Sequence, residues 1–265
     1  GRGPLAARRH GVVLMDVVVF EPLEGRHRVV QAGGGHAPGA DGGPHQVDGL
    51  RRVAQPFTED EAVERAQKRT ARLLAESGLP ETKTLSTLNE AVLPAKVRRQ
   101  LPALIEGGCV DRAVNVLAFG LPGRGKTHFL AALGRELILR HSKKVLFRPT
   151  FKLVAQLLAA KRDLRLEAEL KKLDRFDVLI LDDIGYVRKD EAETSVLFEL
   201  VMHRYERRSL LVTSNQPFSE WENVFSTSAM TVAAVDRLVD HSTLIQINGE
   251  SYRRKRARRM GGPAK

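Results

Sequence analysis

Residues 114–127 read VNVLAFGLPGRGKT, a short apolar run that passes into a glycine-rich turn and then into the start of a helical pattern. The turn, Gly120 to Thr127, matches the pattern G-x-x-x-x-G-K-[ST] at every fixed position. Glycines let backbone N–H groups close around phosphates, the lysine ammonium contacts the outer oxygens, and the threonine hydroxyl is a ligand for Mg²⁺. The stretch therefore predicts a phosphate-binding loop (P-loop), with ATP and Mg²⁺ as cofactors.

This loop supplies the predicted nucleotide contacts. The expected cofactor-binding residues are Gly120, Leu121, Pro122, Gly123, Arg124, Gly125, Lys126, Thr127 and His128. Within this set, Lys126 is also expected to act in catalysis and Thr127 to bind the metal. An ordinary glycine-rich turn is the alternative. The apolar strand before the loop and the amphipathic helix after it favour phosphate binding.

Polar residues follow two later apolar runs. The run 178–181 ends in Asp182 and Asp183, and the run 210–213 is followed by Ser214 and Asn215. We expect Asp182 to hold Mg²⁺ through water and Asp183 to orient or deprotonate the attacking water. Asn215 is expected to contact the γ-phosphate or that water. The alternatives are a helix N-cap pair for the two aspartates and a turn for Asn215, whose turn role is compatible with catalysis.

Short apolar runs alternate with longer helical patterns after residue 113. The expected strands are 114–119, 144–147, 178–181, 210–213 and 243–247, and the expected helices are 126–140, 151–173, 191–207 and 230–239. Such alternation is typical of an α/β fold whose parallel sheet is covered on both faces. The sequence therefore predicts a parallel sheet of about five strands flanked by helices.

Four zones divide the chain. Residues 1–55 are glycine-rich without sustained periodicity, so we expect a disordered or poorly packed extension. The chain begins with Gly1, which leaves open a native extension, a cloning remnant or an altered reading of an upstream sequence. Residues 56–107 are expected to be helical, with helices at 58–78 and 95–105. A nucleotide-binding domain over 108–252 and a basic tail over 253–265 complete the division.

The overall charge points to a polyanionic partner. The formal net charge is +11 and the isoelectric point is about 10.1, which favours nucleic acid over a merely solvated basic surface. Cys109 is the only cysteine, so an internal disulfide is excluded and a reducing, cytoplasmic compartment is expected. No apolar run approaches the ~18 residues of a membrane span. The run 12–20 contains Asp16 and lacks a cleavage site, so we do not expect an export signal.

Two basic stretches are candidate DNA contacts. The first is a stripe at helical spacing, formed by Arg65, Lys68, Arg69 and Arg72. The second is the start of the tail, Arg253, Arg254, Lys255 and Arg256. Both sets suit phosphate contact without base specificity, and for both a solvated surface is the alternative.

Taken in order, these motifs resemble the AAA+ ATPases, and more narrowly the IstB family of ATP-binding helper proteins of insertion-sequence transposition. The likeness covers about residues 58–255 and is carried by residues 125–128, 181–186, 204–207, 213–221, 235–238 and 249–253. It implies that Asp182 and Asp183 form the Walker B pair and that Asn215 is the sensor-1 residue. It also implies that Arg237 is an arginine finger that reaches the ATP site of a neighbouring subunit. A surface arginine paired with Asp236 or Asp240 is the alternative for Arg237.

The resemblance implies a homo-oligomer that assembles with ATP on duplex DNA, carries its ATP sites between subunits, and recruits or stimulates a partner transposase. Many members carry Glu where this chain has Asp183, so slow ATP turnover is expected. Two alternatives stay open. One is a DnaC-type helicase loader with the same core, and the other is a degraded mobile-element ATPase with weak activity.

Overall fold

The computed structural model describes residues 59–186, 191–216, 220 and 228–248. Its α-helices are α1 (Glu59–Ser77), α2 (Ala95–Ile105), α3 (Gly108–Asp111), α4 (Lys126–His141), α5 (Thr150–Arg162), α6 (Leu166–Leu173), α7 (Glu191–Arg204) and α8 (Ser228–Asp240). Its strands are β1 (Asn115–Phe119), β2 (Val145–Pro149), β3 (Val178–Asp182), β4 (Ser209–Ser214) and β5 (Ser242–Gln246). Two 3₁₀ turns, η1 (Glu90–Val92) and η2 (Ile184–Tyr186), lie before α2 and after β3.

The five strands form one parallel sheet in the order β2-β3-β4-β1-β5, which confirms the predicted α/β fold. β1 lies between β4 and β5, with Val116 opposite Leu211 on one side and Thr243 on the other. Because all strands run the same way, their carboxyl ends meet at one edge of the sheet. The P-loop after β1, the acidic pair at the end of β3 and the polar end of β4 therefore share that edge.

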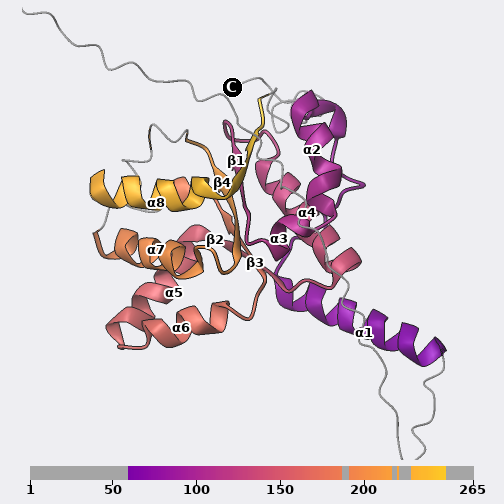
Figure 1. The fold of residues 1–265 in the computed structure, drawn as a ribbon, viewed down its shortest axis with the longest axis horizontal. Coiled ribbons are helices and arrows are strands. Elements are labelled where there is room, and N and C mark those ends of the chain that lie inside the picture. Colours follow the sequence, from indigo (N-terminus) through magenta and orange to yellow (C-terminus); the bar gives the residue numbers. More distant parts are fainter. Residues whose placement is uncertain (1–58, 187–190, 217–219, 221–227, 249–265) are drawn as a thin grey trace, which may run out of the picture. The chain divides into compact units, whose positions relative to one another are not determined.

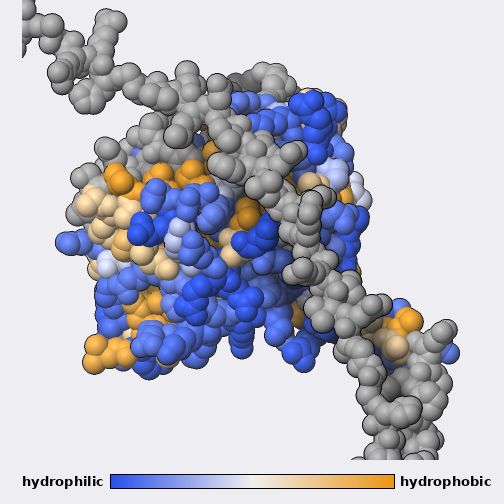
Figure 2. Space-filling model, in the orientation of Figure 1, coloured by the Kyte–Doolittle hydropathy of each residue, from blue (hydrophilic) through white to orange (hydrophobic). Residues whose placement is uncertain are grey.

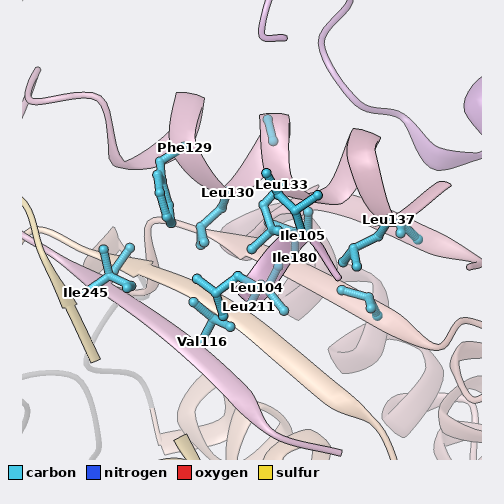
Figure 3. Close-up of a cluster of buried hydrophobic side chains, with 14 of the residues drawn as sticks. Leu104, Ile105, Val116, Phe129, Leu130, Leu133, Leu137, Ile180, Leu211 and Ile245 are labelled. Atoms are coloured by element: carbon cyan, nitrogen blue, oxygen red, sulfur yellow. The ribbon is translucent and has the colours of Figure 1, made fainter. Parts of the chain in front are cut away.

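Helices cover both faces of the sheet (Figure 1). Successive strand residues point to opposite faces, so Val116 and Ala118 join the cluster under α4, whereas Leu117 joins the cluster under α5, α7 and α8. Figure 3 shows the first cluster, in which Phe129, Leu130, Leu133 and Leu137 of α4 face strand side chains and Leu104 and Ile105 of α2. This packing holds the helix that begins at the P-loop firmly against the sheet.

The helices before β1 share this core. Leu73 of α1 and Val97 and Leu104 of α2 are buried in the same cluster as the α4 side chains. The division of the chain into an extension, a helical segment, a nucleotide-binding domain and a tail stays a prediction. Residues 1–58 and 249–265, which include the predicted extension and the predicted basic tail, lie outside the described residues.

The prediction of one helix over 151–173 is wrong. The structure has two helices, α5 and α6, which are separated by Asp163, Leu164 and Arg165. Leu164 has a φ of 57° and is 94% exposed, so the backbone turns there through the left-handed region. The segment contains neither Gly nor Pro, and for this reason no residue type marks the break.

One arginine is an unusual member of the interior. Arg204, at the end of α7, is fully buried. Its guanidinium donates hydrogen bonds to the backbone carbonyls of Leu173 (3.1 Å), Phe176 (3.1 Å) and Ser209 (3.3 Å). Burial lowers the pKa of Arg204 to about 10, so the group is still charged at neutral pH. A single cation therefore joins the end of α6, the start of β3 and the start of β4.

Cys109 is also buried in the core, and burial raises the pKa of its thiol. It therefore packs as a small apolar residue.

Among the helices of the described residues, none has the length and apolar character needed to cross a bilayer.

Candidate nucleotide-binding site

Backbone geometry shapes the turn between β1 and α4. Gly120 has a φ of 147°, and a Cβ atom at this position would collide with the carbonyl oxygen of Ile247. Gly125 has a φ of 96° and directly precedes α4, which begins at Lys126. Non-glycine residues rarely adopt either conformation. The glycines thus allow the chain to turn sharply and to direct the positive end of α4 toward the loop.

The ammonium of Lys126 is held at the edge of the sheet. Lys126 is 5% exposed, and its Nζ donates hydrogen bonds to the carbonyl oxygens of Gly120 (2.5 Å) and Leu121 (3.0 Å). It also donates to Oδ1 of Asn215 at 2.6 Å. The P-loop lysine and the polar residue after β4, which lie 89 positions apart in the chain, are therefore brought into direct contact.

Asn215 also contacts the acidic pair. Its Nδ2 donates to Oδ2 of Asp183 at 2.6 Å, so one amide joins Lys126 to Asp183. The other carboxylate oxygen of Asp183, Oδ1, is buried without a well-formed hydrogen bond to any described residue, although the Gly185 N–H favours the charged form of the carboxyl group. Burial, followed by the nearby Asp182 charge, raises the pKa of Asp183, and Lys126 and Asn215 partly oppose this shift.

A threonine connects the two aspartates. Thr213 Oγ1 donates to Oδ1 of Asp182 at 2.9 Å and accepts from the backbone N–H of Asp183 at 2.7 Å. Asp183 has a φ of 60°, a strained value for a non-glycine residue. Sequence reasoning assigned no role to Thr213, although it lies two residues before Asn215. Its position at the end of β4, beside β3, was the available signal.

The oxygen donors at this edge fit a magnesium ion. Thr127 lies in the first turn of α4 and offers a hydroxyl, and Asp182 at the end of β3 offers a carboxylate. Mg²⁺ prefers such hard oxygen ligands and keeps several waters. Oδ1 of Asp183, which has no well-formed hydrogen bond within the described residues, is an acceptor that a metal-bound water could use. The residue set is thus suited to Mg²⁺, and its occupation by the metal stays a prediction.

His128 is directed toward a different segment. Its Nε2 lies 3.1 Å from Oγ1 of Thr87 and 3.0 Å from the carbonyl oxygen of Thr84. These threonines precede α2 by about ten positions, and no sequence pattern indicated the contact. A direct contact of His128 with nucleotide stays a prediction. Within the described residues, the ring connects the start of α4 to the segment before α2.

Arg237 lies away from its own P-loop. It is in the last turn of α8, and His241, just beyond that helix, accepts a hydrogen bond from the N–H of Asn115 at the start of β1. The P-loop follows the opposite end of β1. The Arg237 guanidinium lies 3.7 Å from Asp236 and 5.8 Å from the ring centroid of Tyr205. The structure therefore does not bring Arg237 together with Lys126, Asp183 and Asn215 of the same chain.

Tyr205 is a residue that sequence reasoning left without a role. Its hydroxyl donates to Oδ2 of Asp240 at 2.6 Å, and this bond raises the pKa of Tyr205 to about 12. The phenol therefore stays protonated at neutral pH, with its ring under Arg237. Aromatic faces attract guanidinium groups, so Tyr205 helps to orient Arg237.

Of the two predicted sets of DNA contacts, one lies within the described residues. The stripe of Arg65, Lys68, Arg69 and Arg72 is exposed on α1. Lys68 pairs with Glu64 at 2.6 Å and Arg72 with Glu76 at 3.1 Å. Residues 253–256 lie outside the described residues. DNA binding by either set stays a prediction.

The chain is similar to ATP-binding proteins of insertion sequences. The chain is 49% identical over 218 residues to an insertion sequence ATP-binding protein of Sinorhizobium fredii, covering 80% of this chain and 73% of that protein. It is 40% identical over 188 residues to the IS21 ATP-binding protein of Pseudomonas aeruginosa, covering 71% of each chain.

The fold is that of AAA+ proteins. Domain III of the replication initiation protein DnaA from Thermotoga maritima superposes with a TM-score of 0.54 at 16% identity, covering 71% of this chain and 79% of that one. At this identity the likeness concerns the fold alone. The model of the family described as IstB-like ATP binding protein matches residues 47–260. With this match and these relatives, the chain belongs to the IstB-like family of ATP-binding proteins.

Proposed function

We propose that the protein is an ATPase that assembles with ATP and Mg²⁺ on duplex DNA and assists a partner transposase. The observation that carries the catalytic part is the hydrogen-bonded series Lys126–Asn215–Asp183 beside the P-loop. A cation for phosphate, an amide for the water or γ-phosphate, and a carboxylate base are thereby gathered at one sheet edge. The insertion-sequence relatives support the transposition part.

The residues of the site have separate roles. Backbone N–H groups of the loop and the Lys126 ammonium hold the phosphates, which replace the Gly120 and Leu121 carbonyl oxygens as partners of Nζ. Asp183 accepts the proton of the attacking water, and Asn215 orients the reacting groups. Thr127 directly, and Asp182 through water, would hold Mg²⁺, which would neutralise charge on the phosphate oxygens. Thr213 positions both aspartates, because its hydroxyl donates to the Asp182 carboxylate and accepts from the backbone N–H of Asp183.

Arg237 completes the site of a second copy of the chain. Its place at the edge opposite the P-loop prevents contact with its own nucleotide but allows contact with that of a neighbour. An arginine supplied in trans stabilises charge on the transferring phosphate. On this basis the proposal includes ATP sites between subunits and hence ATP-dependent oligomers.

Replacing Lys126 by Ala is expected to weaken ATP binding and abolish ATP-dependent DNA association. The substitution removes the cation that contacts the outer phosphates. The checks are titration with a fluorescent ATP analogue and turnover with and without duplex DNA. Exposed Lys152, on α5, is the matched control, and Lys152→Ala should behave like the unsubstituted chain. Unchanged nucleotide affinity in Lys126→Ala would contradict the proposal.

Arg237→Ala is expected to lower DNA-stimulated turnover by about 1,000-fold while leaving ATP affinity unchanged, because arginine fingers act on the transition state. Mixing this variant with Asp183→Asn, which keeps Arg237, should restore activity to roughly a quarter of the normal value if subunits pair at random. Steady-state phosphate release by the mixture is the measurement. A mixture as inactive as its components would show that Arg237 does not act in trans.

A further inference from the structure

The solvent-facing side of α2 carries charge of one sign only. Lys96, Arg98 and Arg99 are exposed, and the helix contains no acidic residue. No ion pair within the described part of the chain involves these three side chains. Figure 2 shows the surface over α2 as strongly hydrophilic. The opposite side of the helix is buried through Val97 and Leu101.

Two other helices with several cations, α1 and α6, also contain acidic residues. α1 has five acidic residues against four basic ones, and two of its cations are in ion pairs along the helix. On α6, Lys171 pairs with Glu167 and Lys172 with Glu169, each at 2.6 Å. α2 thus differs from these helices in presenting three positive charges that no carboxylate of the described residues neutralises.

The position of these cations within α2 is unfavourable for the isolated helix. All three lie in the first five residues of a helix that begins at Ala95. The N-terminus of a helix already has a partial positive charge, so cations there lower helix stability. A negatively charged partner at this surface would remove the penalty.

The basic half of α2 lies toward the nucleotide-binding end of α4. His141, at the end of α4, lies 2.8 Å from the carbonyl oxygen of Ile105 at the end of α2. His128, at the start of α4, contacts Thr84 and Thr87 in the segment before α2. The two helices therefore run in the same direction, with Lys96, Arg98 and Arg99 nearer to the P-loop.

We propose that Lys96, Arg98 and Arg99 form a contact surface for the phosphate backbone of duplex DNA. This inference rests on the proposed function and deepens it, because it assigns DNA contact to a helix that packs on the P-loop helix. Lysine and arginine contacts to phosphate supply affinity that does not depend on sequence and that falls steeply with salt. Three exposed cations without acidic neighbours on their helix match that chemistry.

The test compares two triple variants of the full chain. One carries Lys96→Gln, Arg98→Gln and Arg99→Gln. The matched control carries Arg165→Gln, Lys171→Gln and Lys172→Gln, which removes the same charge from exposed cations that are in ion pairs. Binding to a fluorescein-labelled 40-base-pair duplex is measured by anisotropy at several salt concentrations. Mg²⁺ and a non-hydrolysable ATP analogue are present throughout.

The α2 variant is expected to bind at least about tenfold more weakly at 0.1 M salt, with a salt dependence shallower by about 0.9 for each phosphate that it no longer neutralises. The control should bind nearly as tightly as the unsubstituted chain. Nucleotide affinity should be unchanged, and thermal unfolding should show that the α2 variant is at least as stable as the unsubstituted chain.

Other outcomes separate the inference from the proposed function. Equally weakened binding in both triple variants would overturn the inference, because net charge alone would then explain binding. The α2 variant is also tested for capture of the partner transposase. If it binds DNA normally but fails to capture transposase, the surface contacts an acidic protein partner instead, and the inference is overturned. If the unsubstituted chain does not bind duplex DNA, the proposed function fails and the inference fails with it. Normal binding with an unchanged salt dependence in the α2 variant overturns the inference alone.

Discussion

Replacing Asp183 by Asn is expected to lower ATP turnover about 100- to 10,000-fold, the range typical for loss of a general base, while ATP still binds. Asparagine has nearly the same shape but cannot accept the proton of the attacking water. It also removes a half-buried carboxylate whose pKa is raised by burial and then by the charge of the neighbouring Asp182. The loss of this unfavourable charge should leave the fold at least as stable as before.

Phosphate release under steady-state conditions and titration with a fluorescent ATP analogue check the two halves of this prediction. Asp163→Asn is the matched control, because Asp163 is exposed in the turn between α5 and α6. It should not change turnover. An Asp183→Asn variant that hydrolyses ATP at the normal rate would exclude Asp183 as the base.

The raised pKa of Asp183 also sets the direction of the pH dependence. The folded-state pKa is above the ordinary value for aspartate, so the neutral form accumulates at a higher pH than usual as the solution is acidified. Hydrolysis should therefore decline on the acid side at a pH above the ordinary pKa of about 3.9. The free energy of unfolding depends on pH in the opposite direction to hydrolysis. The stabilising contribution of Asp183 is present below its pKa in the unfolded chain and is lost as the pH rises through its pKa in the folded protein.

Replacing Arg204 by Ala is expected to lower the free energy of unfolding by at least about 3 kcal/mol. The substitution leaves the carbonyl oxygens of Leu173, Phe176 and Ser209 without their donor in a region closed to water. It also leaves a cavity in place of a fully buried side chain. Urea denaturation followed by circular dichroism measures the effect.

Arg207→Ala is the control for Arg204→Ala. Arg207 is exposed and lies 3.4 Å from Asp174, so its removal should change stability by no more than about 1 kcal/mol. Arg204→Lys keeps the charge but replaces a planar group that spans several carbonyls with a single ammonium, and it should be intermediate. Equal stability of the Arg204→Ala and Arg207→Ala variants would contradict a structural role for the buried guanidinium.

Local patterns explain why much of the fold was predictable. Apolar runs of four or five residues and the spacing of Gly120, Lys126 and Thr127 are properties of the chain itself. Parallel strands bring their carboxyl ends together, so the shared edge of Asp182, Asp183 and Asn215 could be expected from the order of the elements. The direct contact of Asn215 with Lys126 could not be predicted in this way, because it depends on the positions of the side chains.

The features that were missed depend on packing between segments that are distant in the chain, or on backbone turns without a marker residue. The break at Leu164 has no Gly or Pro to mark it and is visible only from the backbone. Arg204 can be buried because its guanidinium donates hydrogen bonds to three carbonyl groups that come from separate segments. Thr87 and His128 are 41 positions apart, and neither residue is unusual by itself. Such arrangements arise from packing, which a pattern of single residues does not encode.

If Arg237 acts in trans as proposed, its location opposite the P-loop gives the assembly two different ends. If each subunit completes the site of the next, the contact is head-to-tail, and an open array has one terminal ATP site that lacks an arginine and one terminal arginine that lacks a site. Hydrolysis is then slow at one end only. Subunits would leave an open filament in a fixed direction along DNA, and the assembly would acquire a polarity that the symmetric duplex backbone does not have.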